Sequence, residues 1–229
     1  MTGSAVVIGA SGGIGSAIVQ ALRHSREYDE VLGFGRATDP SLDLLDEDSI
    51  RACAEHVAAR SSDLRLVFDA TGALALKNSR PEKSWRELDP DALVGSFAVN
   101  AIGPALLMKH FLPLLPKTGR SVFATLSARV GSIGDNRLGG WYAYRASKAA
   151  LNQLVRTVAV ELARKKPEAV CVALHPGTVR TSLTDGFAKT GLEVQERDLA
   201  AKRLLGVLEG LSAQESGGFF DYLGKAVPW

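Results

Sequence analysis

Short apolar runs alternate with longer amphipathic stretches along the chain. Six runs have the length and composition of strands: Ala5–Ile8, Glu30–Phe34, Leu64–Ala70, Arg120–Leu126, Ala169–His175 and Phe219–Tyr222. Five stretches have helical patterns: Ile14–Leu22, Asp46–Arg60, Asp91–Leu115, Tyr144–Lys165 and Asp198–Glu209. Strands that alternate with helices predict an α/β fold, a parallel sheet whose strands are joined by crossover helices.

Local signals refine three of these elements. The run Leu64–Ala70 is almost wholly apolar, which is typical of a strand buried on both faces. Asp46 or Asp48 is expected to cap the second helix. The dipeptide Gly103-Pro104 is expected to kink the long third helix, which carries Asn100 near its middle. Because no internal repeat or long linker interrupts the pattern, we expect one domain over residues 1–229.

The composition fits an ordinary soluble globular protein. Hydrophobic residues make up 46% and charged residues 23%, and the formal net charge of +2 gives no reason to expect nucleic acid or a membrane surface as a partner. The apolar run Ala5–Ala10 is too short to span a bilayer. Cys53 and Cys171 lack metal-ligand spacing, so we expect free buried thiols and a cytoplasmic protein. The sequence shows no His, Cys or carboxylate cluster that predicts a metal site.

A glycine-rich turn follows the first predicted strand. The segment VVIGASGGIGSAI places Gly9, Gly13 and Gly15 between that strand and its helix, in the spacing G-x-x-x-G-x-G. Glycine allows a tight turn and lets a pyrophosphate approach the main-chain N–H groups at the helix N-terminus. A glycine-rich loop without a ligand is the alternative, but the position between a strand and a helix favours a dinucleotide site.

The end of the second strand indicates which dinucleotide is bound. NAD-binding folds usually place an acidic residue there to hold the ribose 2′-hydroxyl. This chain has Gly35 followed by Arg36, so no carboxylate repels a 2′-phosphate, and the guanidinium can pair with one. We therefore predict NADP(H) in preference to NAD(H). Arg36 as a solvated loop arginine remains the alternative, since it is the one basic residue that supports the prediction.

Tyr144 and Lys148 are a candidate proton-transfer pair. Their four-residue spacing puts both side chains on one face of a helix. A phenol ionises near ~10, and a nearby ammonium lowers that pKa. Bringing it to ~7 needs about 4 kcal/mol, more than an exposed pair supplies, so the pair is expected in a partly closed cleft. Tyr142 is a weaker candidate because Ala146, not lysine, lies four residues after it.

The order of these motifs resembles the short-chain dehydrogenase/reductase family. The glycine turn is followed by Asn100, Ser127, the Tyr144-x-x-x-Lys148 pair and Pro176-Gly177, and the likeness covers nearly the whole chain. The segment LSARVGSIGDNRLGGWYAYRASKAALN and the ending FFDYLGKAVPW are most similar to the C-factor and sniffer-type carbonyl reductase branch. The resemblance implies a doubly wound Rossmann fold, with a mostly parallel seven-stranded sheet flanked by helices on both faces. It also implies a homodimer or homotetramer paired through the long helices.

The resemblance assigns catalytic roles to four residues. Tyr144 would be the general acid in carbonyl reduction and the base in alcohol oxidation. Lys148 would lower the pKa of the phenol and hold the nicotinamide ribose. The main chain at Asn100 would hold a water that links Lys148 to solvent. The hydroxyl of Ser127 would bond the substrate oxygen.

The serine assignment has an alternative. The family often shows S-S-x-x-G with the second serine catalytic, and alignment on Gly131 puts Ala128 at that place and Ser127 one residue earlier. A shift of one residue at a strand end can turn a side chain to the other face. Either Ser127 still points into the site or another hydroxyl, such as that of Ser132, replaces it.

Further residues would bind the cofactor, again by resemblance. Those of the glycine turn are Gly9, Ser11, Gly12, Gly13, Ile14 and Gly15. The turn Asp69-Ala70-Thr71-Gly72 stands where the family has N-N-A-G, with only Gly72 matching strictly. The remaining candidates are Asp43 for the adenine, with a helix-flanking cap as its alternative, and Pro176, Gly177, Val179 and Thr181 for the nicotinamide. The polar stretch Ser182–Asp198 is expected to form most of a substrate lid over about residues 178–200.

Two functions follow from the sequence. The first is an NADP(H)-dependent oxidoreductase that interconverts a small carbonyl compound and an alcohol by hydride transfer. The second is a nucleotide-binding signalling or regulatory protein on the same fold that does little chemistry. The Tyr144 and Lys148 pair favours the enzyme, whereas Ala128 favours the regulatory protein.

Overall fold

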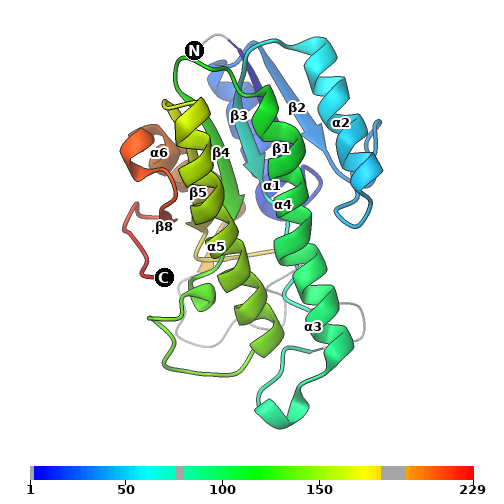
Figure 1. Ribbon diagram of the computed structural model, residues 1–229, viewed down its shortest axis with the longest axis vertical. Helices are drawn as coiled ribbons and strands as arrows, with labels where there is room; N and C mark the ends of the chain where they lie inside the picture. The colour runs from blue at the N-terminus through cyan, green and yellow to red at the C-terminus, as the bar shows by residue number, and fades with distance from the viewer. Residues whose placement is uncertain (1–2, 76–79, 182–193) are drawn as a thin grey trace.

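A parallel sheet of six strands forms the centre of the molecule (Figure 1). The computed structural model describes residues 3–75, 80–181 and 194–229. The strands are β1 Ser4–Ile8, β2 Glu30–Phe34, β3 Leu64–Asp69, β4 Ser121–Leu126, β5 Ala169–His175 and β8 Phe219–Asp221. Their order in the sheet is β2-β1-β3-β4-β5-β8, and every pair is parallel.

Helices cover both faces of this sheet. The α-helices are α1 Gly13–Ser25, α2 Glu47–Arg60, α3 Pro90–Phe97, α4 Gly103–Phe111, α5 Tyr142–Lys165 and α6 Arg197–Gly210. Short 3₁₀ turns span Trp85–Glu87, Leu112–Leu114, Arg129–Gly131 and Ala213–Glu215. One core cluster packs α2, α4 and α5 on one face, and a second packs α1 and α6 on the other (Figure 1). The predicted doubly wound Rossmann fold is confirmed.

The number of strands differs from the expected seven. The described residues contain six strands in the main sheet, with a separate short pair, β6 Thr178–Val179 and β7 Val194–Gln195. The segment between β2 and α2 turns back on itself, because Thr38 and Leu42 both donate backbone hydrogen bonds to the carbonyl of Gly35. A parallel strand needs a crossover of a dozen or more residues before it. This segment is too short to hold a crossover and a further strand.

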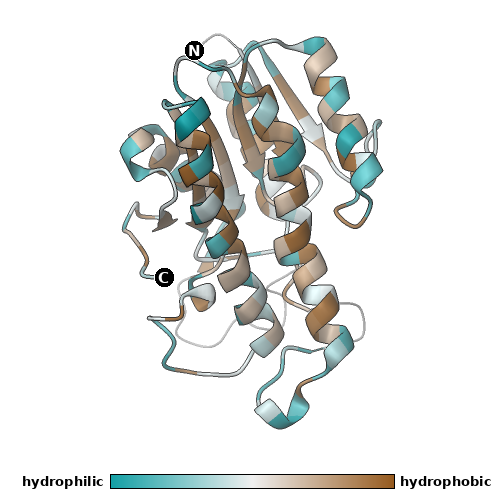
Figure 2. Ribbon diagram, in the orientation of Figure 1, coloured by the Kyte–Doolittle hydropathy of each residue, from teal (hydrophilic) through white to brown (hydrophobic). Residues whose placement is uncertain are grey.

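The middle of the sheet is the core, as the apolar pattern predicted. In β3, Val67 packs into the cluster on the α5 face, whereas Leu66 and Phe68 pack into the cluster on the α1 face. The strands accordingly show hydrophobic residues along most of their length, whereas the helices mix hydrophilic and hydrophobic residues (Figure 2). At about 25 cal/mol per Å² of buried apolar surface, this two-sided burial is the main source of stability.

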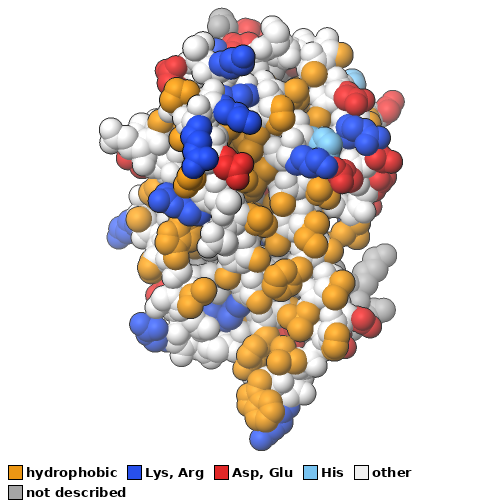
Figure 3. Space-filling model, viewed as in Figure 1, with side chains coloured by type: hydrophobic (Ala, Val, Ile, Leu, Met, Phe, Trp, Pro, Cys, Tyr) orange, Lys and Arg blue, Asp and Glu red, His pale blue; other side chains and the backbone are white. Residues whose placement is uncertain are grey.

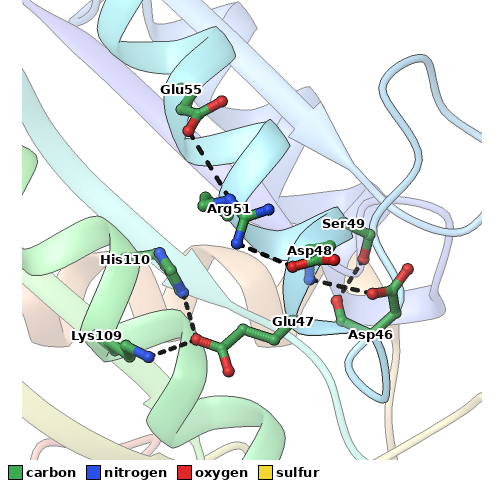
Figure 4. Close-up of polar contacts among 8 residues, drawn as sticks. All are labelled: Asp46, Glu47, Asp48, Ser49, Arg51, Glu55, Lys109 and His110. Carbon is green, nitrogen blue, oxygen red and sulfur yellow. Dashed lines mark hydrogen bonds and ion pairs between the residues drawn. The ribbon is translucent and has the colours of Figure 1, made fainter.

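The second helix begins with the expected cap and is tied to its neighbour. The Asp46 carboxylate accepts a hydrogen bond from the backbone N–H of Asp48 at 3.0 Å, so Asp46 is the cap and Asp48 is not. The next residue, Glu47, reaches across to α4, where its Oε1 lies 2.5 Å from Lys109 Nζ and 2.9 Å from His110 Nε2 (Figure 4). Because Glu47 and Lys109 are exposed to solvent, water screens their attraction and the contact adds little to stability.

The predicted long third helix is divided by a π turn. Helix α3 ends at Phe97, the π turn spans Ala98–Ile102, and α4 starts at Gly103. The irregularity therefore lies directly before the Gly103-Pro104 pair, which is where a kink was expected. A π turn widens the helix locally and often occurs at functional sites. Asn100 lies within it and is fully buried.

The same helical region carries exposed apolar surface. The run Pro90–Leu114 is long and apolar enough to cross a membrane by length and composition alone, with 39% of the window buried. A core helix of a soluble protein meets the same test. Hydrophobic side chains gather over α3 and α4 on the face shown in Figure 3. Val94 of α3 and Ile102 of the π turn are among the exposed large hydrophobic residues.

The sheet topology fixes where a ligand can bind. The chain proceeds from β1 outward to β2 and then returns to β3 on the other side of β1. At such a reversal the loops leave the carboxyl ends of β1 and β3 in opposite directions, which opens a crevice between them. The glycine-rich turn after β1 and the Asp69-Ala70-Thr71-Gly72 turn at the end of β3 therefore lie at this crevice.

Candidate active site

The glycine-rich turn is held by close backbone contacts. Gly9 has a left-handed φ of 78°, and its N–H donates to the carbonyl of Phe34 at 2.8 Å. The N–H of Gly12 then donates to the carbonyl of Gly9 at 2.9 Å. A Cβ at Gly15 would lie 2.1 Å from the Gly9 oxygen. Glycine is therefore required at positions 9 and 15 by conformation and by space.

The N-terminus of α1 fits an anion. Its cap residue, Gly12, makes no side-chain cap hydrogen bond, and the first turn has no acidic residue. Ser11 and Gly12 are exposed, and Ile14 turns its side chain to the α1–α6 core. The first N–H groups of a helix have no partner within the helix and carry a partial positive charge. This end of α1 can therefore receive an anion, and a dinucleotide pyrophosphate there stays a prediction.

The folded chain brings other predicted cofactor residues to this turn. A Cβ at Gly9 would lie 3.2 Å from the Ala70 carbonyl and 3.2 Å from the Thr71 methyl group. A Cβ at Gly13 would lie 2.6 Å from the Thr181 methyl group. The glycine turn, the turn after β3 and the segment after β5 therefore meet, although they are far apart in sequence.

Arg36, predicted to select the cofactor, and Asp43, predicted to contact the adenine, lie differently. The Ser11 hydroxyl oxygen is 3.2 Å from the position of a Cβ at Gly35, and the exposed Arg36 follows directly. Arg36 is thus next to the glycine turn, where a ribose phosphate would lie. The Asp43 carboxylate accepts the backbone N–H of Leu45 at 3.0 Å. This local turn favours the helix-flanking interpretation of Asp43.

The predicted nicotinamide segment is anchored by its neighbours. Gly177 has a φ of 76°, and Val179 is buried in β6. The Gln195 side chain donates to the carbonyl of Pro176 at 2.9 Å, and Arg180 N–H donates to the Gln195 carbonyl at 2.9 Å. Most of the predicted lid, residues 182–193, lies outside the described residues.

Tyr144 and Lys148 share one face at the start of α5, as their spacing predicted. Lys148 is 2% exposed, and its ammonium donates to the carbonyl of Leu126 at the end of β4 at 2.8 Å. The Lys148 Nζ lies 6.0 Å from the centre of the Tyr144 ring. The ring of Trp141 meets the Tyr144 ring edge-on, with 6.3 Å between the centroids.

Burial dominates the proton affinities of this pair. It lowers the pKa of Lys148 to about 8, against an opposing effect of Asp69, and raises the pKa of Tyr144 to about 12. The expectation that Lys148 lowers the phenol pKa is therefore wrong for the chain by itself. The ammonium is bound to a carbonyl some distance from the ring, so its attraction is outweighed by desolvation of the phenolate. At neutral pH Lys148 is charged and Tyr144 keeps its proton.

Asn100 holds the loop after β3 against the lysine. Its Oδ1 accepts the Ala73 N–H at 2.9 Å, and its Nδ2 donates to the Ala73 carbonyl at 2.8 Å and to Ser96 Oγ at 3.2 Å. A Cβ at Gly72 would lie 3.3 Å from both Asn100 Oδ1 and Lys148 Nζ. The π turn thus positions a side-chain clamp beside Lys148, while the predicted main-chain water at Asn100 stays a prediction.

Ser127 contacts α5 and not the tyrosine. It is 3% exposed, and its hydroxyl donates to Asn152 Oδ1 at 2.7 Å. Asn152 lies one helical turn after Lys148, on the inner face of α5. Ser127 therefore joins the end of β4 to α5, and no contact between it and Tyr144 is seen among the described residues.

The other hydroxyl candidate also has a structural partner. Ser132 is 1% exposed, and its Oγ accepts the backbone N–H of Asp135 at 3.1 Å. Ala128, at the place of the family's serine, is 9% exposed and precedes the turn Arg129–Gly131. The described side chains thus give Tyr144 no hydroxyl partner in contact.

Two residues near the site were not predicted from sequence. Arg197 begins α6, and its Cδ lies 3.1 Å from the position of a Cβ at Gly13. A cation beside a helix N-terminus is unfavourable unless an anion lies between them, so Arg197 is suited to a bound phosphate.

Glu82, the second of these residues, is 6% exposed. Its side-chain carboxylate accepts the N–H of Ala143 at 3.3 Å, and its backbone carbonyl accepts the N–H of Trp141 at 2.5 Å. It fixes the start of α5. Only the folded chain reveals these long-range contacts.

The described ranges hold no group of three or more His, Cys, Asp or Glu side chains placed to bind a metal ion.

Comparisons with known proteins agree with this arrangement. A family model described as enoyl-(acyl carrier protein) reductase matches residues 9–209. The C-signal protein of Myxococcus xanthus is 38% identical over 144 residues, covering 62% of this chain and 82% of that protein. The 1-hydroxy-2-glutathionyl-2-methyl-3-butene dehydrogenase of Rhodococcus sp. strain AD45 is 29% identical over 234 residues, covering 98% of both chains.

Solved structures extend the likeness over the whole fold. The NADPH-bound carbonyl reductase from chicken fatty liver has a TM-score of 0.85 and 28% identity, covering 99% of this chain and 98% of that one. A short-chain dehydrogenase/reductase of Burkholderia multivorans with bound NADP has a TM-score of 0.80 and 27% identity, covering 99% of both chains. The carbonyl reductase Sniffer of D. melanogaster, at 23% identity and a TM-score of 0.83, shows the common fold.

Proposed function

The chain belongs to the short-chain dehydrogenase/reductase family and is an oxidoreductase of that family, and we propose that it reduces a small carbonyl compound with NADPH. The observation that supports this proposal most is the half-buried Tyr144 one helical turn from the buried Lys148, in a chain whose glycine turn fits a dinucleotide. The reverse reaction, oxidation of an alcohol, uses the same groups.

The residues at the crevice would hold the cofactor by complementary charge. The N-terminus of α1 with Arg197 receives the pyrophosphate, and Arg36 receives a ribose 2′-phosphate. Thr181 and Val179 would hold the carboxamide of the nicotinamide. The bound cofactor supplies the hydride, and the protein supplies orientation and the proton.

Tyr144 acts as the general acid in this proposal. With a pKa of about 12 it is protonated at neutral pH, so it can donate a hydrogen bond to the substrate oxygen and release its proton as that oxygen gains charge. The Lys148 ammonium, with a pKa of about 8, then stabilises the phenolate that remains. Asn100 keeps the loop that borders Lys148 in place.

A second function is favoured by one specific observation. The place of the family's catalytic serine is taken by Ala128, and both nearby serine hydroxyls have structural partners. A relative with 38% identity is a C-signal protein. The regulatory alternative is therefore a nucleotide-binding signalling protein in which Tyr144 and Lys148 support only slow chemistry.

The exposed apolar surface supports a proposal about assembly. Val94 is 69% exposed on α3, Ile102 is 53% exposed in the π turn, and Val160 is 47% exposed on α5. A second copy of this chain would cover this surface in a homodimer or homotetramer of a cytoplasmic protein. Light scattering at micromolar concentration should give at least twice the monomer mass, and Val94→Glu should lower it. A monomer mass for the parent protein would contradict the assembly.

Replacing Tyr144 tests the proposed acid. Tyr144→Phe removes the proton donor and keeps the ring, so kcat for carbonyl reduction should fall by roughly 10²–10⁴-fold. The affinity for NADPH, measured by fluorescence titration, should stay within about threefold, since the ring keeps its packing. Turnover is followed by loss of reduced-cofactor absorbance with a panel of aldehydes, ketones and quinones.

Tyr142→Phe is the matched control, because Tyr142 lies in the same first turn of α5 and lacks a lysine four residues later. It should retain parent activity. If Tyr144→Phe turned over as fast as the parent, the proposed mechanism would be excluded. If the parent turned over none of the compounds while binding NADPH, the regulatory function would be favoured.

Replacing Arg36 tests the choice of cofactor. Arg36→Ala removes the guanidinium beside the proposed 2′-phosphate, so the Kd for NADPH should rise about tenfold or more while the Kd for NADH changes little. Arg51→Ala, in an exposed arginine on α2, should change neither constant. Equal affinity of the parent protein for NADH and NADPH would show the assignment to be wrong.

Restoring the missing hydroxyl separates the two functions. Ala128→Ser places a donor where the family's serine stands, and one such donor is worth roughly 10²–10³ in kcat. We expect kcat for a carbonyl substrate to rise at least about tenfold, because part of that gain is offset by imperfect alignment.

Ser127→Ala should lower kcat much less than Tyr144→Phe, since the Ser127 hydroxyl of the parent protein is bound to Asn152. A large loss in Ser127→Ala with no gain in Ala128→Ser would instead make Ser127 the catalytic hydroxyl.

A further inference from the structure

Asp69 is a fully buried carboxylate on the catalytic face of the sheet. It ends β3, and its exposure is 0%. Val67 of β3 and Phe123 of β4 belong to the core cluster on the α5 side. Side chains alternate along a strand, so Asp69 and Thr125, each two residues further on, point to the same side. That side is where Lys148 enters from α5.

The contacts of Asp69 fit its ionised form. Its Oδ1 accepts the Thr71 N–H at 3.0 Å and the Thr71 hydroxyl at 2.5 Å, and its Oδ2 accepts the Thr125 hydroxyl at 2.6 Å. An ionised carboxylate only accepts hydrogen bonds, and three donors are arranged around it. Hydroxyl distances of about 2.5–2.7 Å are typical of bonds to a charged oxygen. Burial still raises the pKa of Asp69, against the effects of these donors and of Lys148.

Lys148 is a buried cation that needs a counter-charge. Lys148 is 2% exposed, and its ammonium has one described hydrogen-bond acceptor, the Leu126 carbonyl. Its attraction to Asp69 acts without a described direct ion pair. Burial lowers the pKa of Lys148, and the charge of Asp69 is the effect that opposes it. The other groups that face the two charges are neutral at pH 7: the hydroxyls of Thr71 and Thr125, the Asn100 amide, Gly72 and the Tyr144 phenol.

We propose that Asp69 is the counter-ion of Lys148, a positioning residue that keeps this lysine charged in the site. The turn that Asp69 begins stands where the family has N-N-A-G, and an asparagine there offers similar hydrogen bonds but no charge. Asp69 therefore does more than hold a turn. A charged Lys148 stabilises the phenolate of Tyr144, and this consequence alone rests on the proposed function.

Asp69→Asn tests the charge separately from the turn. The amide can still accept from Thr71, and the Thr125 hydroxyl can rotate to accept from its NH₂. The titration of Lys148 is followed by NMR in protein labelled with ¹³C at lysine Cε. In the parent we expect a midpoint at about pH 8. Loss of the nearby anion should lower the proton affinity of Lys148 at least tenfold in the variant, so that its midpoint moves to lower pH.

The control variant makes the same change of charge, from aspartate to asparagine, at a position away from the site. Asp63→Asn removes a carboxylate at the opposite end of β3, where Asp63 pairs with Arg65. It should leave the Lys148 midpoint unchanged. Lys148→Met identifies the signal by its loss. An unchanged midpoint in Asp69→Asn would overturn the proposal, as it would if Asp69 were protonated in the parent.

A double-mutant cycle of unfolding free energies tests the proposal even if Asp69→Asn is poorly stable. The free energies of unfolding in urea are compared for Asp69→Asn, Lys148→Met and the double variant. Because each single variant leaves an unpaired buried charge, the double variant should be more stable than the sum of the two losses predicts. Additive losses would contradict the pairing. Neither measurement uses turnover, so the two proposals can fail separately. If the parent protein were inactive but the Lys148 midpoint still moved in Asp69→Asn, the reductase proposal would be refuted and the counter-ion proposal supported.

Discussion

The burial of the Lys148 ammonium is the constraint around which the rest of the site is arranged. An ammonium taken out of water must be matched by acceptors and opposite charge, or it loses its proton. The Leu126 carbonyl at the end of β4 provides the acceptor, and Asp69 at the end of β3 provides the charge. Both strand ends lie on one edge of the sheet because the strands are parallel. The position of α5 over that edge therefore decides both the fold of the crevice and its chemistry.

Close packing of small groups turns this charged centre into a binding crevice. Gly72 lets the loop after β3 pass within contact distance of Lys148, and Asn100 holds that loop through two hydrogen bonds to Ala73. On the other side of the crevice, Gly9 and Gly15 let α1 begin directly against the end of β1. A side chain at either glycine would separate the phosphate seat from the proton-transfer pair.

Sequence patterns predicted the elements well, because hydrophobic periodicity and glycine spacing are local properties. All six strands of the main sheet and the main helices lie where the pattern placed them, and residue spacing singled out the glycine turn and the Tyr144 and Lys148 pair. The prediction of a seventh strand in the main sheet was wrong, because the segment after Gly35 folds back on itself. The predicted lowering of the Tyr144 pKa was wrong in direction, because burial raises that pKa and burial depends on the surrounding fold. Arg197 and Glu82 act across long stretches of sequence that no spacing rule connects.

Burial keeps Tyr144 a protonated phenol at neutral pH and makes the neighbouring Lys148 ammonium more acidic than an exposed lysine. The most direct test is an NMR titration of protein labelled with ¹³C at tyrosine Cζ, with Tyr144→Phe identifying the signal. The structure predicts that Tyr144 keeps its proton through pH 10, since its pKa is about 12, while Lys148 titrates near pH 8. A Tyr144 signal that titrated near pH 7 would contradict this account, because the phenol would then already be the stronger acid of the pair.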